Sequence, residues 1–375
     1  MEPALAPEGL RTARASALGG RLARAGLPLF FCCGALLAAA GCGRGPAPKL
    51  LKPLACAPQP LALALDGDAE RLAVACSRTS EVLVFELGSP GKAPLRLATR
   101  PHPCALLFSP DGQRLVVAEE CGPAASLAVF KMPDGRFARR VPCLAHPRSM
   151  AWAEDRAKLY LCAGDEGVAV LRAGDFRLEK VIKAGGRAQQ LCLQPASAWA
   201  YLSSQQADSL ACVKLADRSL HAAVQTAPLP RGLALSPDGA FAWVACEGLE
   251  PAPAVAAADE GATLPAQAAG PAQPAGADWG ELSVVRLQDL VATDRLPAAG
   301  GALALAFSKS GRSVFSVSGR TGFFDAYDSL SHARLKRLFL GRLPSALAYD
   351  ARRGLCYVAL HDAAAVAVVD VSAFP

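Results

Sequence analysis

The chain has 375 residues, with 39 Lys and Arg against 33 Asp and Glu, and aromatic residues make up only 6% of it. A formal net charge of +6 is too mild for a nucleic-acid-binding surface, and an apolar content of 52% excludes a disordered charged-tail protein. This length permits two or three average domains or one large all-β domain, so internal repeats have to be sought before domains are counted.

The N-terminus carries the pattern of an export signal. An apolar run over residues 27–40 follows four basic residues, Arg11, Arg14, Arg21 and Arg24. The run is shorter than the ~20 residues that a helix needs to cross a bilayer, so export followed by cleavage is favoured over a permanent membrane span. Residues 1–41 are therefore predicted to be a signal peptide.

The end of this segment reads Ala39-Ala40-Gly41-Cys42 and resembles a bacterial lipobox, although Ala39 stands where leucine is commonest. The resemblance implies a lipidated Cys42 at the start of the mature chain and a short tether over residues 42–48. An ordinary secretory peptide cut beside Gly41 is the alternative. Because several acyl chains anchor a protein firmly, we expect a location in the bacterial cell envelope, at the outer membrane or the periplasmic face.

One local pattern recurs seven times in the rest of the chain. Its reference positions are Leu72, Leu115, Leu159, Ala200, Ala242, Val314 and Cys356, with spacings of 43, 44, 41, 42, 72 and 42. Twelve residues before them stand Pro60, Pro103, Pro147, Ala188, Pro230, Ala302 and Pro344. A period of 40 to 45 residues with four short strand signals is typical of a propeller blade.

Each repeat is expected to form four antiparallel strands. In the second repeat they would cover residues 105–108, 115–118, 126–130 and 139–143. The first of these is a continuous apolar run, which is typical of a strand covered on both faces. Ser109–Gly112 and Ser236–Gly239 read Ser-Pro-Asp-Gly, a type I turn sequence that would join the first two strands. The predicted fold is all-β, a seven-bladed β-propeller over residues 49–375.

Two irregularities complete this organisation. The seventh repeat stops after its third strand, Ala365–Val371, and Lys49–Leu54 has the composition of the missing fourth strand. We therefore expect the N-terminal strand to close the ring. The spacing of 72 is explained by a Pro/Ala/Gly-rich insertion in blade five, residues 248–280, which we expect to be flexible because it holds few large apolar residues.

The repeats resemble those of the YVTN-type, lactonase-like β-propeller family. The residues that carry the resemblance are Pro103, Ser109–Gly112, Arg114–Ala118, Leu159–Leu161, Pro230, Ser236–Gly239, Trp243, Val244 and Val366–Asp370. The resemblance implies the fold and leaves the activity open, since this superfamily includes lactonases, binding scaffolds and quinoprotein relatives. The asparagine that usually closes the second strand is replaced by Cys76, Glu119, Ala163, Ser204, Cys246, Ser318 and Leu360.

The sequence contains no strong catalytic motif, but overlaying the repeats brings polar residues to one mouth of the channel. His102 and His146 directly precede the strand-opening proline, Arg148 and Arg231 directly follow it, and His361 reaches the same mouth after a second strand. Nearby carboxylates are Glu119, Glu120, Asp165, Glu166 and Glu247. Imidazoles and carboxylates suit zinc, iron or nickel, and arginines suit a carboxylate or phosphate. Repeat ancestry explains the same pattern, so we expect no metal or cofactor.

Ten cysteines remain beyond the signal peptide and Cys42. Export permits disulfides, and Cys76 and Cys121 are the first pair to test because they end the second strands of neighbouring blades. Cys56 and Cys143 occupy equivalent repeat positions in separated blades. Cysteines within predicted strands, such as Cys192, are expected simply to pack.

These observations favour a monomeric, lipid-anchored envelope propeller that binds another envelope protein without catalysis. One alternative is a lactonase-like hydrolase with His102, His146 and nearby carboxylates in metal or acid/base roles. The other is a protein that binds a small anion or a metal at the channel mouth.

Overall fold

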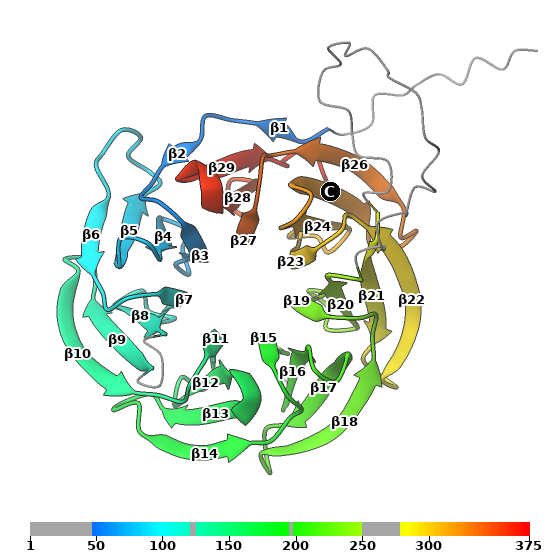
Figure 1. Cartoon of the computed structure of the whole chain (residues 1–375), viewed down its shortest axis with the longest axis horizontal. Coiled ribbons are helices and arrows are strands. Elements are labelled where there is room, and N and C mark those ends of the chain that lie inside the picture. The colour runs from blue at the N-terminus through cyan, green and yellow to red at the C-terminus, as the bar shows by residue number, and fades with distance from the viewer. Residues whose placement is uncertain (1–46, 121–124, 195–197, 250–277) are drawn as a thin grey trace, which may run out of the picture. The chain divides into compact units, whose positions relative to one another are not determined.

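The computed structural model describes residues 47–120, 125–194, 198–249 and 278–375. The predicted signal peptide, Cys42 and residues 250–277 of the predicted insertion lie outside this range. Within the range, no helix has the length and apolar character required to span a bilayer. The described residues form seven sheets arranged in a ring (Figure 1), which confirms the predicted seven-bladed propeller.

Six of the blades are four-stranded antiparallel sheets whose strands follow in chain order from the axis outward. Blade one comprises β3 (Pro60–Leu65), β4 (Arg71–Cys76), β5 (Glu81–Glu86) and β6 (Leu95–Ala98), and blade two comprises β7 (Pro103–Phe108), β8 (Arg114–Glu119), β9 (Ser126–Lys131) and β10 (Arg136–Pro142). Blade three comprises β11 (Pro147–Trp152), β12 (Lys158–Ala163), β13 (Gly167–Arg172) and β14 (Leu178–Ile182), and blade four comprises β15 (Ala188–Leu193), β16 (Trp199–Ser204), β17 (Ser209–Lys214) and β18 (Ser219–Gln225). Blade five comprises β19 (Pro230–Leu235), β20 (Phe241–Cys246), β21 (Gly280–Arg286) and β22 (Val291–Ala298), and blade six comprises β23 (Ala302–Phe307), β24 (Ser313–Ser318), β25 (Phe323–Asp328) and β26 (Arg334–Phe339).

The apolar core lies between the blades. The middle strands contain continuous apolar runs, such as residues 72–76 of β4, because a neighbouring blade covers each face of the sheet. Val84 of blade one, for example, packs in one cluster with Val117 and Phe130 of blade two. Outer strands such as β10 and β18 are exposed or half-buried along their length, because they lie at the rim of the ring. Burial therefore holds each blade to its neighbours rather than to a common centre.

Blade seven closes the ring with a strand from the other end of the chain. It comprises β27 (Pro344–Asp350), β28 (Leu355–Leu360) and β29 (Ala365–Asp370), with β1 (Lys49–Leu50) and β2 (Leu54–Ala55) outside them. Lys49 lies opposite Asp370 and Leu54 opposite Val366 in antiparallel register. Pro53 has no N–H to donate, and the strand is interrupted there. The predicted closure by Lys49–Leu54 is present.

The turns between first and second strands gather on one face of the ring, here called the turn face. Neighbouring blades are linked there by side-chain donors to backbone carbonyls. Arg71 Nη2 donates to the carbonyl of Gly112 at 2.8 Å, and Gln194 Nε2 donates to that of Gly239 at 2.9 Å. Both acceptors end a Ser-Pro-Asp-Gly turn, so these turns also join adjacent blades.

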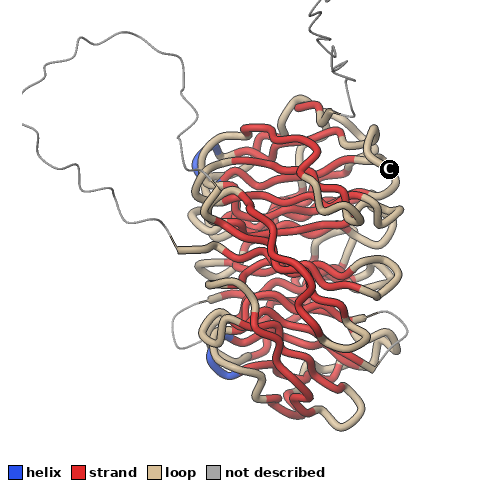
Figure 2. The backbone as a smooth tube through the Cα atoms, turned by 90° about the vertical axis from the view of Figure 1, so that its right-hand side faces the viewer, coloured by secondary structure: helices blue, strands red, loops and turns tan. Residues whose placement is uncertain are grey.

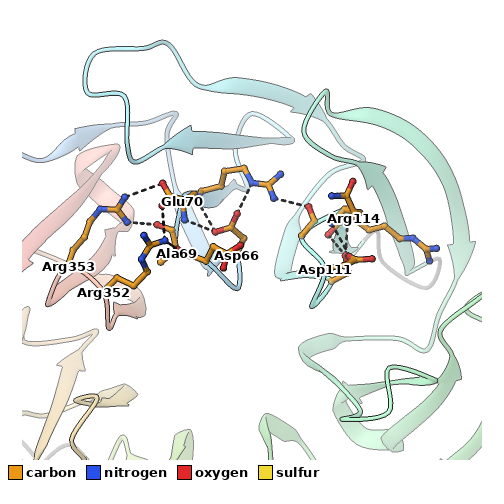
Figure 3. Close-up of polar contacts among 12 residues, drawn as sticks. Asp66, Ala69, Glu70, Asp111, Arg114, Arg352 and Arg353 are labelled. Carbon is orange, nitrogen blue, oxygen red and sulfur yellow. Dashed lines mark hydrogen bonds and ion pairs between the residues drawn. The ribbon is translucent and has the colours of Figure 1, made fainter.

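Arginines make such contacts across the seam between blades seven and one (Figure 3). Arg352 Nη1 donates to the carbonyl of Asp68 and, at 2.7 Å, to Glu70 Oε1. Arg353 donates to the carbonyl of Ala69. The seam is thus held by strand pairing at its rim and by arginines on the turn face.

The opposite face is here called the mouth face. It carries the residues before each first strand and those after each second strand, because the two strands are antiparallel. Figure 2 shows the loops gathered on two faces, with both 3₁₀ turns, η1 (Gly164–Glu166) and η2 (His361–Ala363), on the same one. Both follow second strands, so they belong to the mouth face.

Deleting residues 49–54 should destabilise the whole ring. It removes the pairing of β1 and β2 with β29 and costs about 4 kcal/mol, which would lower the melting temperature by roughly 10 °C. Thermal melting followed by circular dichroism measures this. Deleting residues 44–47, which leaves both strands intact, is the control; equal melting of the two deletion variants would contradict ring closure by this segment.

Candidate functional site

A left-handed turn precedes the first strand of every blade. The seven residues at this position all have φ between +51° and +77°, and they are Gln59, His102, His146, Arg187, Leu229, Gly301 and Leu343. Six of the seven carbonyls accept the N–H of the residue that follows the second strand of the same blade, at 2.9–3.1 Å. The position is thus defined by backbone geometry and holds chemically unrelated side chains.

This turn accounts for the two His-Pro pairs of the sequence. Histidine is enriched among residues with positive φ. The left-handed backbone at His102 and His146 therefore explains these histidines without a chemical role. The carbonyl of His102 accepts the N–H of Glu120 at 3.0 Å. Both imidazoles are exposed on the mouth face.

Ion pairs connect the remaining predicted site residues. Glu120 Oε1 lies 2.5 Å from His146 Nδ1, and Glu120 Oε2 lies 3.2 Å from Arg148 Nη1, which joins blade two to blade three. Arg231 Nη1 lies 2.6 Å from Glu247 Oε1 within blade five. His361 Nδ1 lies 3.0 Å from its neighbour Asp362. The predicted residues therefore form separate small pairs around the mouth rather than one constellation.

A cavity of about 270 Å³ lies along the inner strands and is the candidate site. Arg148 and Arg231 line it, whereas the three predicted histidines do not. Gln189 of blade four lies between the two arginines in the order of the blades, and Gln190 also lines the wall. Blades three to five thus contribute a cationic and amide arc, here called the polar arc.

The other four blades give the cavity a less polar wall. At the position occupied by Arg148, they carry Leu61, Cys104, Leu303 and Ser345. Cys104 Sγ donates to the carbonyl of Pro147 at 3.1 Å, and Ser345 Oγ donates to that of Pro60 at 2.7 Å. Each of these two donors is thus committed to the next blade. The cavity is amphipathic, and it suits a ligand that has an anionic and an apolar part.

Glu119, expected among the mouth carboxylates, is instead fully buried. Arg140 contacts it through Nε at 2.7 Å and Nη2 at 2.9 Å, Ser126 donates its hydroxyl, and the N–H of Arg100 donates at 2.9 Å. Burial raises the pKa of Glu119, but these hydrogen bonds outweigh it and hold the pKa below its usual value. Glu119 is therefore a structural anion of blade two.

Burial opposes nucleophilic activation of four of the described cysteines. Burial raises the pKa of Cys104, Cys143, Cys192 and Cys246 to about 12. Across the described residues, no group of three or more His, Cys, Asp or Glu side chains is placed to hold a metal ion. The chemistry on view at the mouth is ion pairing and hydrogen bonding.

Gln189 and Gln190 were not singled out by the sequence pattern, although they line the cavity. The repeat spacing aligns Ala188 of blade four with the strand-opening prolines, but only the charged residues of blades three and five were selected after that position. The signal that could have found Gln189 is its place directly after that position, the same place as Arg148 and Arg231.

Comparison with known proteins supports the fold alone. A chain of the hydrazine synthase from Kuenenia stuttgartiensis superimposes with a TM-score of 0.70 at 14% sequence identity, covering 83% of this chain and 95% of that chain. At that identity the similarity shows a shared propeller architecture. No protein-family model matches the chain, and no curated protein matches its sequence.

Replacing Glu119 with Gln should destabilise the protein in a pH-dependent way. Because the folded pKa of Glu119 is depressed, its stabilisation is present above the unfolded pKa of about 4.3 and is lost as the pH falls through the folded pKa. At pH 7 the variant should lose about 3 kcal/mol, and the gap to the wild type should narrow below about pH 4. Urea unfolding between pH 3 and 8 measures this.

Glu166→Gln is the matched control, because that carboxylate makes a solvent-exposed pair with Lys183 on the same face. A constant gap between the wild type and Glu119→Gln at every pH would show that the carboxylate charge contributes nothing.

Proposed function

We propose that this protein is a lipid-anchored β-propeller of the bacterial cell envelope that binds another envelope protein without catalysing a reaction. The observation that carries the proposal is the short distance in sequence between Cys42 and the first strand of the propeller. The strand that closes the ring begins at Lys49, and only six residues separate it from Cys42. An extended tether of that length spans about 25 Å at most, so a lipid on Cys42 would hold the ring close to the bilayer.

The construction of the ring supports a binding role. Each blade packs against two neighbours, and the seam adds strand pairing and arginine contacts, so the loops of the mouth face rise from a preorganised frame. A preorganised surface loses little conformational entropy on association, which favours tight binding. The exposed ion pairs of the mouth face offer both signs of charge to a partner.

A lactonase-like hydrolase is less well supported. It would use His102 and His146 as metal ligands or bases, yet both occupy the left-handed turn that every blade shares, and His146 is engaged by Glu120. Glu120 and Glu247 are each paired with an arginine. Each of these carboxylates would have to leave its ion pair before it could act on a substrate.

Binding of a small organic anion in the channel is the second candidate function. The specific observation is that Arg148 of blade three and Arg231 of blade five both line the cavity, one on each side of blade four. A guanidinium has five N–H donors, and Glu247 engages Arg231 through one nitrogen, Nη1. The guanidinium therefore retains donor capacity toward the cavity.

The anchor and the partner are tested together. Cys42→Ser should abolish fatty-acid labelling and release the protein from membranes, because the substitution removes the thiol that would be acylated. In-cell cross-linking should give one saturable adduct of defined mass with the wild type and a weaker one with the released variant. Unchanged labelling would refute the lipidation, and labelling without any adduct would refute the binding role.

The anion site is tested by calorimetric titration with small carboxylates such as succinate and citrate. Arg231→Ala should weaken binding at least tenfold, which corresponds to about 1.4 kcal/mol for one lost charge-assisted contact. Lys183→Ala is the control, because that cation lies on the mouth face outside the cavity lining. Equal losses in the two variants would show general charge attraction rather than a site.

A further inference from the structure

The residue that ends the second strand anchors the loop through which the chain enters the same blade. Ser204 Oγ donates to the carbonyl of Gly186 at 2.9 Å, and Ser318 Oγ donates to that of Gly300. Glu119 Oε1 accepts the N–H of Arg100 at 2.9 Å. In each case the partner lies 18 or 19 residues earlier in the chain. This anchoring contact recurs in blades two, four and six with different chemistry.

In blade one, two cysteines occupy the corresponding places at the strand end and in the entering loop. Cys76 ends the second strand, and it lies opposite Pro60 in the sheet register. Cys56, four residues before Pro60, lies in the entering loop directly after β2, and its N–H donates to the carbonyl of Ala364 at 3.0 Å. Both side chains pack in the apolar layer between blades seven and one, and each thiol shifts the pKa of the other, lowering that of Cys76 and raising that of Cys56.

The equivalent positions of other blades lack this pairing. Cys143 also lies four residues before a strand-opening proline, but Ala163 stands where blade one has Cys76. Cys246 ends the second strand of blade five, where its thiol interacts with Thr226 and Ser283. Among the blades as described, blade one alone has a thiol on both sides of the contact. The pair therefore does not follow simply from repetition of the blade.

We propose that Cys56 and Cys76 are a disulfide site that fixes the chain between β2 and β3 to the second strand of blade one, next to the seam. Both are free thiols in the structure. The oxidant is a disulfide, either oxidised glutathione or a dithiol oxidase of the envelope. One cysteine thiolate attacks the oxidant, which forms a mixed disulfide and releases one thiol. The sulfur of the other cysteine then attacks the cysteine sulfur of that mixed disulfide and releases the second thiol. The oxidant has then accepted two electrons and two protons, and one S–S bond joins the cysteines.

In the reduced pair, the Cys56 thiol lowers the pKa of Cys76, although burial opposes the change. At the same position of blade five, burial raises the pKa of Cys246 to about 12. The thiolate is the nucleophile in disulfide exchange, so Cys76 is selected over Cys246. The thiol pair rests on the geometry of the seam, and only the oxidising surroundings rest on the export proposed above.

The consequence concerns the N-terminal strand. Without the bond, β1 and β2 are held to blade seven by strand pairing at the outer edge of the sheet. With it, the chain immediately after β2 is also fixed to the second strand of blade one. Tension on a lipid tether at Cys42 that detached β1 and β2 would then reach β4 through the disulfide as well as β3 through the chain.

The test uses the purified full-length protein, first reduced and then equilibrated in glutathione redox buffers. Free thiols are blocked with N-ethylmaleimide, and the protein is digested with trypsin, which separates the two cysteines by cleavage after Arg71. Mass spectrometry should find the Cys56–Cys76 linkage as the main cross-link, while Cys143 and Cys246 stay alkylatable once the protein is unfolded. The oxidised protein should melt roughly 5 °C higher than the reduced one.

Cys56→Ser and Cys56→Ala should both remove the linkage and the redox-dependent melting shift, whereas the matched control Cys143→Ser should change neither. Separate alkylation of Cys56 and Cys76 in buffers of oxidised glutathione, or a dominant link from Cys76 to Cys121, would overturn the proposal. Acid-trapped protein from cells then reports on the compartment. A linkage that forms in buffer but is absent in cells would count against export and not against the thiol pair.

Discussion

The pairing of the N-terminal strand with β29 is the constraint on which the molecule depends. A ring of sheets buries its apolar layers only if every blade has two neighbours, and an open ring would expose one layer to water at each free end. Because β1 and β2 belong to the sheet of blade seven, the two ends of the chain stabilise the same blade. Closure therefore converts seven marginal sheets into one cooperative unit.

The blades divide structural and chemical roles between their strands. The middle strands carry the apolar layers, and the outer strands carry charge, as Arg140 and Arg337 do when they hold the buried carboxylates of Glu119 and Asp325. The inner strands have few neighbours on the axis side, so their side chains set the character of the channel. The difference between Arg148 and Leu61 at equivalent positions makes one wall polar and the other apolar.

Much of the fold could be predicted from the sequence because blade number, turn position and ring closure depend on local composition and spacing. Strand bounds in the second repeat came within a few residues, since Pro103 and the Ser109–Gly112 turn mark the limits of β7. The site was harder. The contact of Glu120 with Arg148 crosses from one blade to the next, and the facing of Cys56 and Cys76 depends on the path of a loop. Alignment of repeats identifies equivalent positions but gives no side-chain direction.

The left-handed turn before each first strand separates shape from chemistry at the channel entrance. Its carbonyl secures the loop in six blades, while its side chain ranges from Leu229 to Arg187 without altering the backbone course. Substitutions there would change the side chains at the channel entrance while the backbone keeps its course. A new binding specificity could therefore arise by changing a few of these turn residues, without any change in the fold of the ring.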